Sequence, residues 1–555
     1  MAEEGASRRD GTPSSSDPTA WLHSALRMGA DRTFIETSQG RRFTYGELAQ
    51  LSASFASVLA HRGVSAGDRV LVRVDKSVEA IALYVACLRM GAVFVPMNTA
   101  YTTHELEYFI RDAEPALIVV RPDDFSAMAG LLPQNEQARI VTLGTAGDGT
   151  LLAGVGADSR AGAAGTVGAG ADPRAGAAGT VGTGADPRAG AAGASPTPDH
   201  QLAPNALAAL LYTSGTTGKP KAAMLTRGNL ASNAATLVDL WRFTSSDVLL
   251  HALPLFHIHG LFVATNTVLA SAASMIFVPK FDTDEVFRGL PRASVMMGVP
   301  TYYTRMLGDS RLSRESTRHM RLFVSGSAPL SAEHHREFEQ RTGHGILERY
   351  GMTETSMIAS NRYERRVPGS VGAALPGVEV RIADPESGKV IDKPDAIGMI
   401  EVRGPNVFQA YWRNPQKTAA DFRPDGFFVT GDIGRIDAHG YVHIVGRAKD
   451  LIITGGYNVY PAEVEQELNA LPGVFESAVF GVPHPDFGEG VTALIVRAAA
   501  AGEVDEATIL RSLRERLAGY KLPKRVLFAA ELPRNTMGKV QKQALRDAHA
   551  KLYAG

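Results

Sequence analysis

The sequence has little of what marks disulfide-bonded, membrane-spanning or nucleic-acid-binding proteins. Its single cysteine, Cys87, excludes an internal disulfide and any multi-cysteine zinc site. Lysine and arginine number 57 against 58 aspartates and glutamates, so there is no basic surplus for nucleic acid. Segment 1–18 is polar and lacks the apolar core of a signal peptide, and the best membrane-span candidate, 260–279, is interrupted by Thr, Asn and Ser. We therefore expect a cytoplasmic protein in which 260–279 forms a buried helix followed by a strand.

The 555 residues are too many for one hydrophobic core, so two or more domains are expected. Between residues 69 and 112, strand-like segments (69–74 and 94–97) alternate with helix-like segments (78–90 and 104–112). This alternation predicts a parallel sheet covered by helices, in which Cys87 is a small core residue. Further strands are predicted at 274–278, 294–297 and 322–324.

The last hundred residues alternate in a pattern of their own. Pro461 suits the first position of a helix, and Val464, Leu468 and Leu471 form its apolar stripe. Strands are predicted at 474–482 and 493–496, and a second helical stripe contains Ile509, Leu510, Leu513 and Leu517. We predict an α/β protein with a large N-terminal domain, 19–448, of layered parallel and mixed sheets with helices. A small α+β domain, 449–555, follows it.

Segment 144–200 contains a tandem repeat. A unit that begins at Arg160 recurs almost unchanged from Arg174 and starts again at Arg188, a period of 14 residues. The unit has almost no side chain large enough to build a core, so burial cannot offset the entropy lost on ordering. We expect 144–200 to be a disordered insertion and 1–18 to be a disordered tail.

The most informative segment is 212–221, which contains two glycines, two lysines, three threonines and a serine within ten residues. An apolar run, 206–211, precedes it and is predicted to be a buried strand, and Thr226 is predicted to cap a helix that runs towards Trp241. Glycines let backbone N–H groups approach an anion, hydroxyls donate to it and lysines neutralise it. The spacing of the glycines does not fit a Walker A loop. A solvated Gly/Thr turn is the alternative.

This loop resembles the phosphate loop of the acyl-adenylate-forming enzymes, a family that includes the acyl-CoA synthetases. Six further segments match the same family in the same order: 325–329, 350–355, 430–432, 446–450, 455–458 and 533–539. The resemblance extends from about residue 21 to residue 545, apart from the repeat. The resemblance implies that the small domain is a mobile lid.

The resemblance also implies roles for individual residues. Tyr350 packs on adenine, Thr353 contacts the α-phosphate, and Asp432 binds the ribose with help from Arg447. Glu354 binds Mg²⁺, a hard dication that needs one carboxylate when ATP phosphates and water complete its shell. The predicted ATP- and AMP-binding residues are Thr213, Ser214, Gly215, Thr216, Thr217, Gly218, Lys219, Lys221, Ser325, Gly326, Ser327, Ala328, Pro329, Tyr350, Gly351, Met352, Thr353, Asp432 and Arg447.

The remaining motifs predict the catalytic residues and the residues that bind coenzyme A. Lys539 is expected to enter with the lid and hold the substrate carboxylate and the α-phosphate, so that Lys539, Glu354 and Thr213 form the predicted catalytic set. Lys449 takes the hinge position, and Gly455, Gly456 and Tyr457 line the coenzyme A tunnel. Without the resemblance, Glu354 would be a surface acid, Lys539 a solvated charge and segment 325–329 a plain strand-to-helix turn.

The acyl pocket is expected between segments 251–260 and 298–305. His257 and His259 lack a visible third metal ligand, so His257 is predicted to line the pocket. Arg305 does not suit a fatty-acid or aryl pocket, because an unpaired cation is costly there, but it suits a dicarboxylate that it can bind bidentately. Segments 249–260, 277–282, 297–307 and 348–355 are similar to the malonate–CoA ligases of this family. Ser356 and Ile358 leave selectivity between malonate and methylmalonate open.

These motifs predict an ATP-dependent ligase that adenylates malonate and transfers it to coenzyme A, with Mg²⁺ as cofactor. Only 16 residues follow Lys539, and they hold no carrier domain, which favours free coenzyme A. The alternatives are a ligase for methylmalonate or another small acid, a stand-alone enzyme that loads a carrier protein, and a non-catalytic nucleotide-binding scaffold. No nucleic acid or membrane partner is expected. Because acetylation would remove the charge of Lys539, a lysine acetyltransferase is a candidate regulatory partner.

Overall fold

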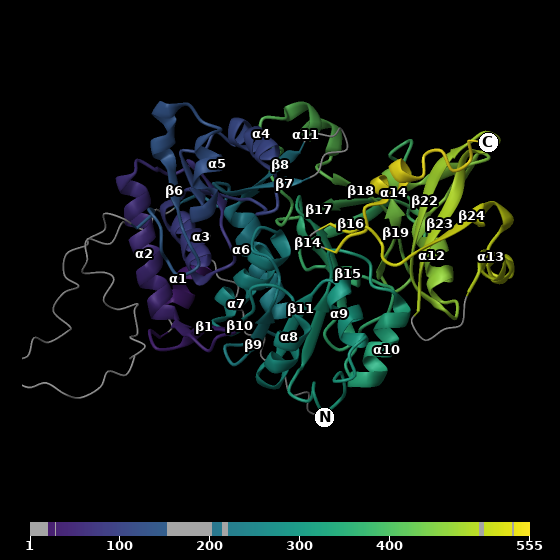
Figure 1. The fold of residues 1–555 in the computed structure, drawn as a ribbon, viewed down its shortest axis with the longest axis horizontal. Coiled ribbons are helices and arrows are strands. Elements are labelled where there is room, and N and C mark those ends of the chain that lie inside the picture. The colour runs from purple at the N-terminus through teal and green to yellow at the C-terminus, as the bar shows by residue number, and fades with distance from the viewer. Residues whose placement is uncertain are drawn as a thin grey trace, which may run out of the picture. The chain divides into compact units, whose positions relative to one another are not determined.

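Figure 1 shows the computed structural model, which describes residues 20–27, 29–152, 202–213, 220–498, 504–535 and 538–554. The expected tail, the three repeat starts and loop residues 214–219 lie outside this described part. The chain forms two compact units, one of residues 48–201 and the other of residues 1–47 with 202–555. Leu151 is fully buried and its backbone N–H bonds to Thr142 at 3.0 Å, so ordered chain extends beyond the predicted insertion boundary at 144.

The larger unit contains a nine-stranded sheet in the order β15-β14-β13-β12-β11-β9-β10-β1-β2. Its central strands run parallel: β13 (Ile346–Met352), β12 (Leu322–Ser325), β11 (Val295–Gly298), β9 (Val248–His251), β10 (Ser274–Phe277) and β1 (Thr33–Thr37). The edges are antiparallel, with β2 (Arg42–Thr44) on one side and β14 (Ser356–Ser360) and β15 (Ala373–Ala374) on the other. The strands predicted near 274, 294 and 322 are confirmed.

Three helices bury one face of this sheet: α8 (Thr283–Gly289), α9 (Pro300–Leu307) and α10 (Ala332–Thr342). Their apolar residues join strand residues in one core cluster, in which Tyr303 of α9 meets the rings of Phe323 and Phe338 edge-on. Burial of such aromatic side chains is the main source of stability for a sheet covered by helices.

The apolar segment after β9 is a buried helix followed by a strand, as predicted. A π-helical turn, His259–Thr265, continues into α7 (Asn266–Ser271) and then into β10. Within the described part of the chain, no helix has both the length and the apolar character needed to span a bilayer.

The phosphate-loop segment joins two antiparallel strands, β7 (Leu207–Thr213) and β8 (Lys221–Thr226), in which Thr213 lies opposite Lys221. Helix α6 (Arg227–Leu240) follows, and α1 (Ala20–Arg27) belongs to the same unit. The predicted cap is confirmed: the Thr226 hydroxyl accepts from the backbone N–H of Asn229, whose side chain in turn accepts from the backbone N–H of Thr226. Such reciprocal bonds satisfy two otherwise unpaired donors at the helix start.

A four-stranded antiparallel sheet precedes the C-terminal part. It contains β16 (Glu379–Ala383), β17 (Gly398–Arg403), β18 (Phe428–Ile436) and β19 (Val442–Arg447), with α11 (Pro415–Asp421) inserted between β17 and β18. Asp432 of β18 lies opposite Arg447 of β19.

The C-terminal part contains β20 (Ile452–Thr454), β21 (Tyr457–Val459), α12 (Pro461–Asn469), β22 (Val474–His484), β23 (Gly488–Arg497), α13 (Glu506–Arg514), β24 (Arg525–Ala529) and α14 (Lys542–Ala548). The predicted stripe of α12 is confirmed, because Val464, Leu468 and Leu471 are all buried in one cluster with Ile509 and Leu513 of α13. The chain thus combines parallel and mixed sheets with helices, and the predicted α/β class is confirmed. The domain boundary near residue 449 stays a prediction.

The smaller unit contains the parallel strands β3 (Arg69–Arg73), β4 (Val93–Pro96), β5 (Leu117–Val120) and β6 (Ile140–Thr142), paired in the order β6-β5-β3-β4. Helices α2 (Tyr45–His61), α3 (Val78–Met90), α4 (Thr103–Ala113) and α5 (Phe125–Ala129) accompany them. Helix α3 has the predicted bounds and buries Cys87 completely. The alternation predicted between 69 and 112 is therefore confirmed.

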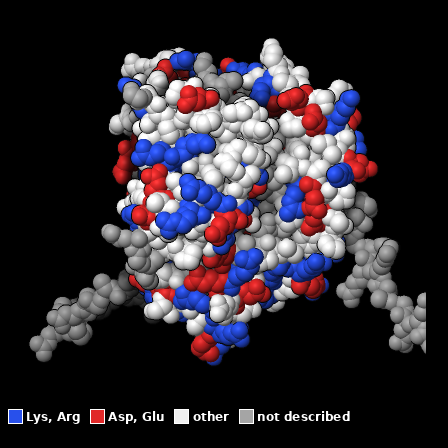
Figure 2. Space-filling model, turned by 90° about the vertical axis from the view of Figure 1, so that its right-hand side faces the viewer, with Lys and Arg blue, Asp and Glu red and all other residues white. Residues whose placement is uncertain are grey.

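Figure 2 shows lysine and arginine side chains intermixed with aspartate and glutamate side chains on one face of the molecule. This mixture matches the net charge of −1, in which 57 basic residues balance 58 acidic ones. The visible surface therefore presents no extended field of a single sign.

Candidate active site

Four of the predicted motifs follow parallel strands of the nine-stranded sheet, at the carboxyl ends of those strands. Segment 325–329 follows β12, segment 350–355 lies at the end of β13, the 251–260 segment follows β9, and the 298–305 segment follows β11. Open α/β sheets bind ligands outside the carboxyl ends of their strands. The fold therefore brings together motifs that lie up to a hundred residues apart in sequence.

The tyrosine, aspartate and arginine of the predicted nucleotide site are in direct contact. The Tyr350 hydroxyl donates to Oδ2 of Asp432 at 2.5 Å, and Nε of Arg447 lies 3.1 Å from Oδ1. Burial and the negative charge of Asp432 raise the pKa of Tyr350 well above its ordinary value, so Tyr350 stays protonated and remains a donor. Asp432 is thus held as a buried carboxylate, 4% exposed, in a fixed orientation.

Lys539 reaches this site from the C-terminal part of the chain. It follows a turn in which Asn535 and Lys539 exchange hydrogen bonds, and Gly538 packs so closely on Thr301 of α9 that a Cβ there would lie 2.7 Å from the threonine hydroxyl. Gly538 also has a positive φ of 71°, which favours glycine. Burial and the charge of Arg447 lower the pKa of Lys539 to about 8, although Asp432 opposes the shift.

A chain of polar contacts links the lysine at the start of β8 to the predicted magnesium ligand. Nζ of Lys221 donates to the hydroxyl of Tyr411 at 2.5 Å, and that hydroxyl donates to Oε1 of Glu354 at 3.0 Å. Lys221 also lies 3.7 Å from Glu354 and 3.5 Å from Asp421. Sequence reasoning missed Tyr411 and Asp421, because no motif surrounds them.

Glu354 suits a magnesium ion that arrives with ATP. It is 4% exposed, and both of its contacts among the described residues, with Tyr411 at 3.0 Å and Lys221 at 3.7 Å, are made by Oε1. No group of three His, Cys, Asp or Glu side chains able to hold a metal occurs in the described ranges. A single carboxylate with phosphate oxygens and water fits Mg²⁺ better than a site built of protein ligands alone.

The glycine and serine of the two nucleotide motifs have specific backbone roles. A Cβ at Gly351 would lie 1.9 Å from the carbonyl oxygen of Ser356, so the turn after Tyr350 has no room for a side chain. Ser327 has a φ of +72°, which is strained for a non-glycine residue. Both motifs begin where a strand ends. Strand β13 ends at Met352, directly before Thr353, and strand β12 ends at Ser325, shortly before Ala328 and Pro329.

Two histidines and an unpredicted arginine lie on the acyl side. Burial and the charges of Arg349 and Lys539 lower the pKa of His257 to about 4, so His257 is neutral at physiological pH. Nδ1 of His259 lies 3.2 Å from the hydroxyl of Ser327. Arg349 directly precedes Tyr350 and is 3% exposed. In the sequence, Arg349 could have been singled out only as a charged residue inside a strand that is otherwise buried.

Arg305, the predicted acyl-pocket arginine, lies on α9 and is exposed. Its guanidinium is 5.9 Å from the ring of Phe281, which stacks on Tyr302 at 4.1 Å between ring centroids. Its role as a carboxylate ligand stays a prediction.

The predicted hinge and coenzyme A residues lie together at the start of the C-terminal part. Lys449 occupies a short 3₁₀ turn, Ala448–Asp450. Gly455 and Gly456 join β20 to β21 with positive φ values of 57° and 81°, and exposed Tyr457 stacks on Tyr520 at 4.7 Å. Thr213 and Lys221 border the phosphate loop, whereas Ser214, Gly215, Thr216, Thr217, Gly218 and Lys219 lie outside the described residues.

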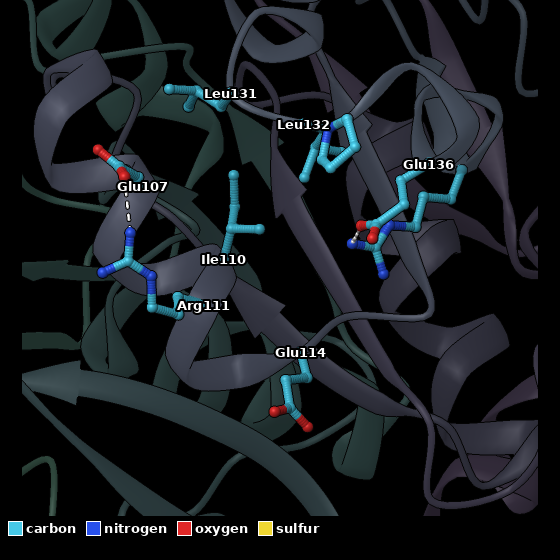
Figure 3. Close-up of a pocket in the computed structure, with 9 residues that line it drawn as sticks. Glu107, Ile110, Arg111, Glu114, Leu131, Leu132 and Glu136 are labelled. Carbon is cyan, nitrogen blue, oxygen red and sulfur yellow. Dashed lines mark hydrogen bonds and ion pairs between the residues drawn. The ribbon is translucent and has the colours of Figure 1, made fainter.

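Figure 3 shows a cavity of about 390 Å³ in the smaller unit, between α4 and the segment after α5. None of its lining residues belongs to the predicted site. Its charges are satisfied locally, since Arg111 pairs with Glu107 at 2.6 Å and Arg139 pairs with Glu136. This cavity is therefore separate from the candidate active site.

Comparison with known proteins gives consistent matches along the chain. Residues 22–412 match the model of the AMP-binding enzyme family, and residues 463–539 match the AMP-binding enzyme C-terminal domain. Indoleacetate–CoA ligase from Aromatoleum aromaticum is 34% identical over 96% of this chain and 98% of its own length. Mitochondrial malonate–CoA ligase from Mus musculus is 33% identical over 94% of this chain and 89% of its own. The crystal structure of ATP-bound MatB from Rhodopseudomonas palustris is 51% identical, with a TM-score of 0.85, and the match covers 97% of this chain and all of that one.

Proposed function

The chain belongs to the AMP-binding enzyme family, and from that premise we propose that it joins malonate to coenzyme A, giving malonyl-CoA, AMP and pyrophosphate. AMP-forming acid–thiol ligation follows from the family, and the identity of the acid is the proposal. The observation that carries the adenylation step is the contact of Tyr350 and Arg447 with Asp432, whose charge also acts on buried Lys539. The likeness to the mitochondrial malonate–CoA ligase of Mus musculus, at 33% identity over 94% of this chain, supports a small diacid as the substrate.

The first step is adenylation. An oxygen of the malonate carboxylate attacks the α-phosphorus of ATP, the bond from that phosphorus to the bridging oxygen breaks, and pyrophosphate leaves with the electron pair. Asp432 is placed to accept hydrogen bonds from the ribose hydroxyls, which fixes the nucleotide. Lys539 is placed to stabilise the negative charge that collects around the α-phosphate in the transition state. Glu354 is the residue that would hold Mg²⁺, which supplies charge neutralisation on the phosphates when bound.

The second step is thioester formation. The sulfur of coenzyme A attacks the acyl carbon of the mixed anhydride, the bond from that carbon to the AMP oxygen breaks, and the thiol proton passes to solvent. We expect the C-terminal part to turn about Lys449 between the steps, so that Lys539 leaves and the turn at Gly455 and Gly456 approaches the pantetheine arm. Glycine lets the backbone come close to so thin a ligand. Neither step needs a protein nucleophile.

Acid-dependent exchange of labelled pyrophosphate into ATP tests the proposal. The panel contains malonate, methylmalonate, acetate, octanoate and benzoate. We expect strong exchange with malonate, weaker exchange with methylmalonate and poor exchange with the monoacids. Strong exchange with octanoate or benzoate, and none with malonate, would overturn the choice of acid.

Two other functions remain as outcomes of the same assays. Transfer of malonate to a carrier protein but not to free coenzyme A would identify a stand-alone loading enzyme. Retention of nucleotide binding without exchange for any acid would identify a scaffold, and Lys539→Ala separates the cases because only an enzyme loses exchange. Acetylation of Lys539 by a lysine acetyltransferase is expected to inactivate adenylation for the same reason.

A further inference from the structure

The peptide bond that carries Lys539 is held by a side chain at the base of its turn. The carbonyl oxygen of Gly538, which belongs to this peptide bond, accepts a hydrogen bond from Nη1 of Arg534 at 2.6 Å. The same guanidinium forms an ion pair through Nη2 with Oε2 of Glu476, a residue of β22. Arg534 therefore links a strand of the C-terminal part to the peptide bond directly before the lysine.

The other hydrogen bonds of the turn fix different atoms. The backbone N–H of Asn535 donates to the carbonyl of Lys539 at 2.9 Å, and the carbonyl of Asn535 accepts from the backbone N–H of Gly538 at 2.8 Å. Oδ1 of Asn535 accepts from the backbone N–H of Lys539 at 3.0 Å. Arg534 and Val540 pair as an antiparallel bridge below the turn. None of these bonds uses the carbonyl oxygen of Gly538, so Arg534 adds the hold on that side of the peptide bond.

The conformation of Gly538 explains why a separate hold is useful. Its φ of 71° lies in the left-handed region, and a glycine leaves that region at little cost because no Cβ restricts it. Such a change would turn the peptide bond and, with it, the side chain of Lys539. A larger residue is excluded, because a Cβ on Gly538 would lie 2.7 Å from the hydroxyl oxygen of Thr301. The close approach thus requires a glycine, and its freedom is limited by Arg534.

The other end of the hold lies on a paired strand. Glu476 of β22 is opposite Val496 of β23 in the antiparallel sheet. The side chains of Arg534 and Glu476 are 26% and 21% exposed, so solvent screens this ion pair less than a pair at the open surface. A guanidinium suits the position because its planar fork donates to two acceptors in fixed directions.

We propose that Arg534 is a positioning residue for adenylation, which orients the ammonium of Lys539 towards the α-phosphate while Glu476 anchors it. This inference rests on the proposed ligase function and adds a residue to the same site. Arg534 acts through Lys539, since its side chain contacts Gly538 and Glu476 in the described part of the chain. Without the hold, Lys539 would point in several directions, and a misplacement of about 1 Å at a reacting centre can cost about 100-fold in rate.

The first test combines Arg534→Met with Lys539→Ala. Malonate-dependent pyrophosphate exchange is measured for the wild type, both single variants and the double variant. In the wild-type background, we expect Arg534→Met to lower kcat about tenfold or more and to change the KM for ATP less than about twofold. In the Lys539→Ala background the same substitution should cost less than about twofold, because the residue through which it acts is missing. Equal losses in the two backgrounds would overturn the inference.

The thioester half-reaction and a second arginine provide the controls. Arg534→Met should convert supplied malonyl-AMP at the wild-type rate, and equal losses in both half-reactions would make Arg534 a structural residue. This comparison decides the question if exchange by Lys539→Ala is too slow to measure. Arg516→Met breaks an ion pair with Glu467 that does not involve the turn, and it should leave both half-reactions unchanged. A loss of exchange in Arg516→Met as large as in Arg534→Met would also contradict the inference.

Proteolysis tests the hold without any substrate. Trypsin cleaves after lysine where the chain opens locally, so we expect cleavage after Lys539, mapped by mass spectrometry, to be about tenfold faster in Arg534→Met than in the wild type. An unchanged cleavage rate would contradict the inference. Failure of the wild type to exchange pyrophosphate with any acid would instead overturn the proposed function, and the cleavage rates would still show whether Arg534 holds the turn.

A milder substitution covers the case in which Arg534→Met does not fold. Arg534→Lys keeps a cation but loses the fork that reaches both Gly538 and Glu476. We expect it to lower exchange about threefold and to leave the thioester half-reaction unchanged. Exchange at the wild-type rate in Arg534→Lys would then overturn the inference.

Discussion

The hydroxyl of Tyr411 donates to Glu354 at 3.0 Å while it accepts from Lys221 at 2.5 Å. Burial and the charge of Glu354 raise the pKa of Tyr411 far above its ordinary value, so the phenol remains protonated. One neutral hydroxyl therefore separates a lysine of the phosphate-loop hairpin from the carboxylate expected to hold Mg²⁺. In this position Tyr411 holds the lysine 3.7 Å from Glu354, longer than a direct hydrogen bond between the two charges.

Tyr411→Phe is expected to remove that separation. The ion pair between Lys221 and Glu354, now 3.7 Å long, would shorten to a direct hydrogen bond and compete with Mg²⁺ for the carboxylate. We expect half-maximal pyrophosphate exchange at a higher Mg²⁺ concentration and a kcat about tenfold lower, the loss of roughly one hydrogen bond to a charged group. Titration of exchange activity with Mg²⁺ measures both effects.

Tyr441→Phe is the matched control for that substitution. The Tyr441 hydroxyl is also buried but has no hydrogen-bond partner within the described part of the chain. Its removal should leave the Mg²⁺ dependence as it is. The same Mg²⁺ dependence in Tyr411→Phe and wild type would show that Tyr411 does not position Glu354.

The pH dependence of adenylation is expected to report Lys539. Burial and the charge of Arg447 lower the pKa of Lys539 to about 8, and the ammonium is the form that can stabilise the α-phosphate. The cation is therefore present below pH 8 and lost as the pH rises through 8. We expect kcat/KM for pyrophosphate exchange to fall above that pH, since this parameter reports the free enzyme.

The thioester half-reaction provides the control for Lys539. Supplied malonyl-AMP needs no charge at the α-phosphate for attack by coenzyme A, so Lys539→Ala should lose exchange about 100-fold or more yet retain most of this second step. Equal losses in the two half-reactions would mean that Lys539 serves the whole fold rather than adenylation.

The elements that sequence alone predicted are those with strong local signals. Helix α3 was predicted with its observed bounds, and in the structure Ser77 caps its start and Gly91, at φ +80°, ends it. Thr226 was predicted as a cap because a hydroxyl before a helix accepts from its free N–H groups. Helix α13 ends at Arg514, but Leu517, three residues later, is still partly buried against the apolar cluster of the C-terminal part. The predicted apolar stripe is therefore longer than the helix.

The missed residues owe their roles to tertiary contacts. Tyr411 meets Glu354 across 57 residues and Lys221 across 190, and nothing local to Tyr411 encodes either contact. Arg349 was visible in the sequence as a charge beside Tyr350, but its lack of a partner depends on what β12 and the His259 turn place around it. Arg305 was chosen because a guanidinium suits a second carboxylate and because of the family resemblance, and its role stays a prediction.

Deletion of residues 161–194 is expected to leave exchange activity and the melting temperature nearly unchanged. The repeat there has almost no large apolar side chains and so has little to bury. Activity assays and thermal unfolding of the shortened chain measure the effect. A control deletion of 146–152 should lower the melting temperature, because it removes fully buried Leu151. A large loss of stability from the repeat deletion itself would contradict the prediction of a disordered insertion.

Asp247 is expected to be one of the most important charges for stability. Burial alone would raise its pKa, but hydrogen bonds from Arg321, from Ser294 and from the backbone of Thr244 lower it below its ordinary value. Because the folded-state pKa is depressed, this stabilisation is complete above the unfolded pKa of about 4 and is lost as the pH falls below it. Asp247→Asn should therefore lower the free energy of unfolding by about 2 kcal/mol at pH 7, and by less near pH 3.

Asp309→Asn, which breaks an exposed pair with Arg311, should have little effect at either pH. Urea unfolding at the two pH values measures this difference, and a loss from Asp247→Asn that stayed constant with pH would show that packing, rather than charge, accounts for it.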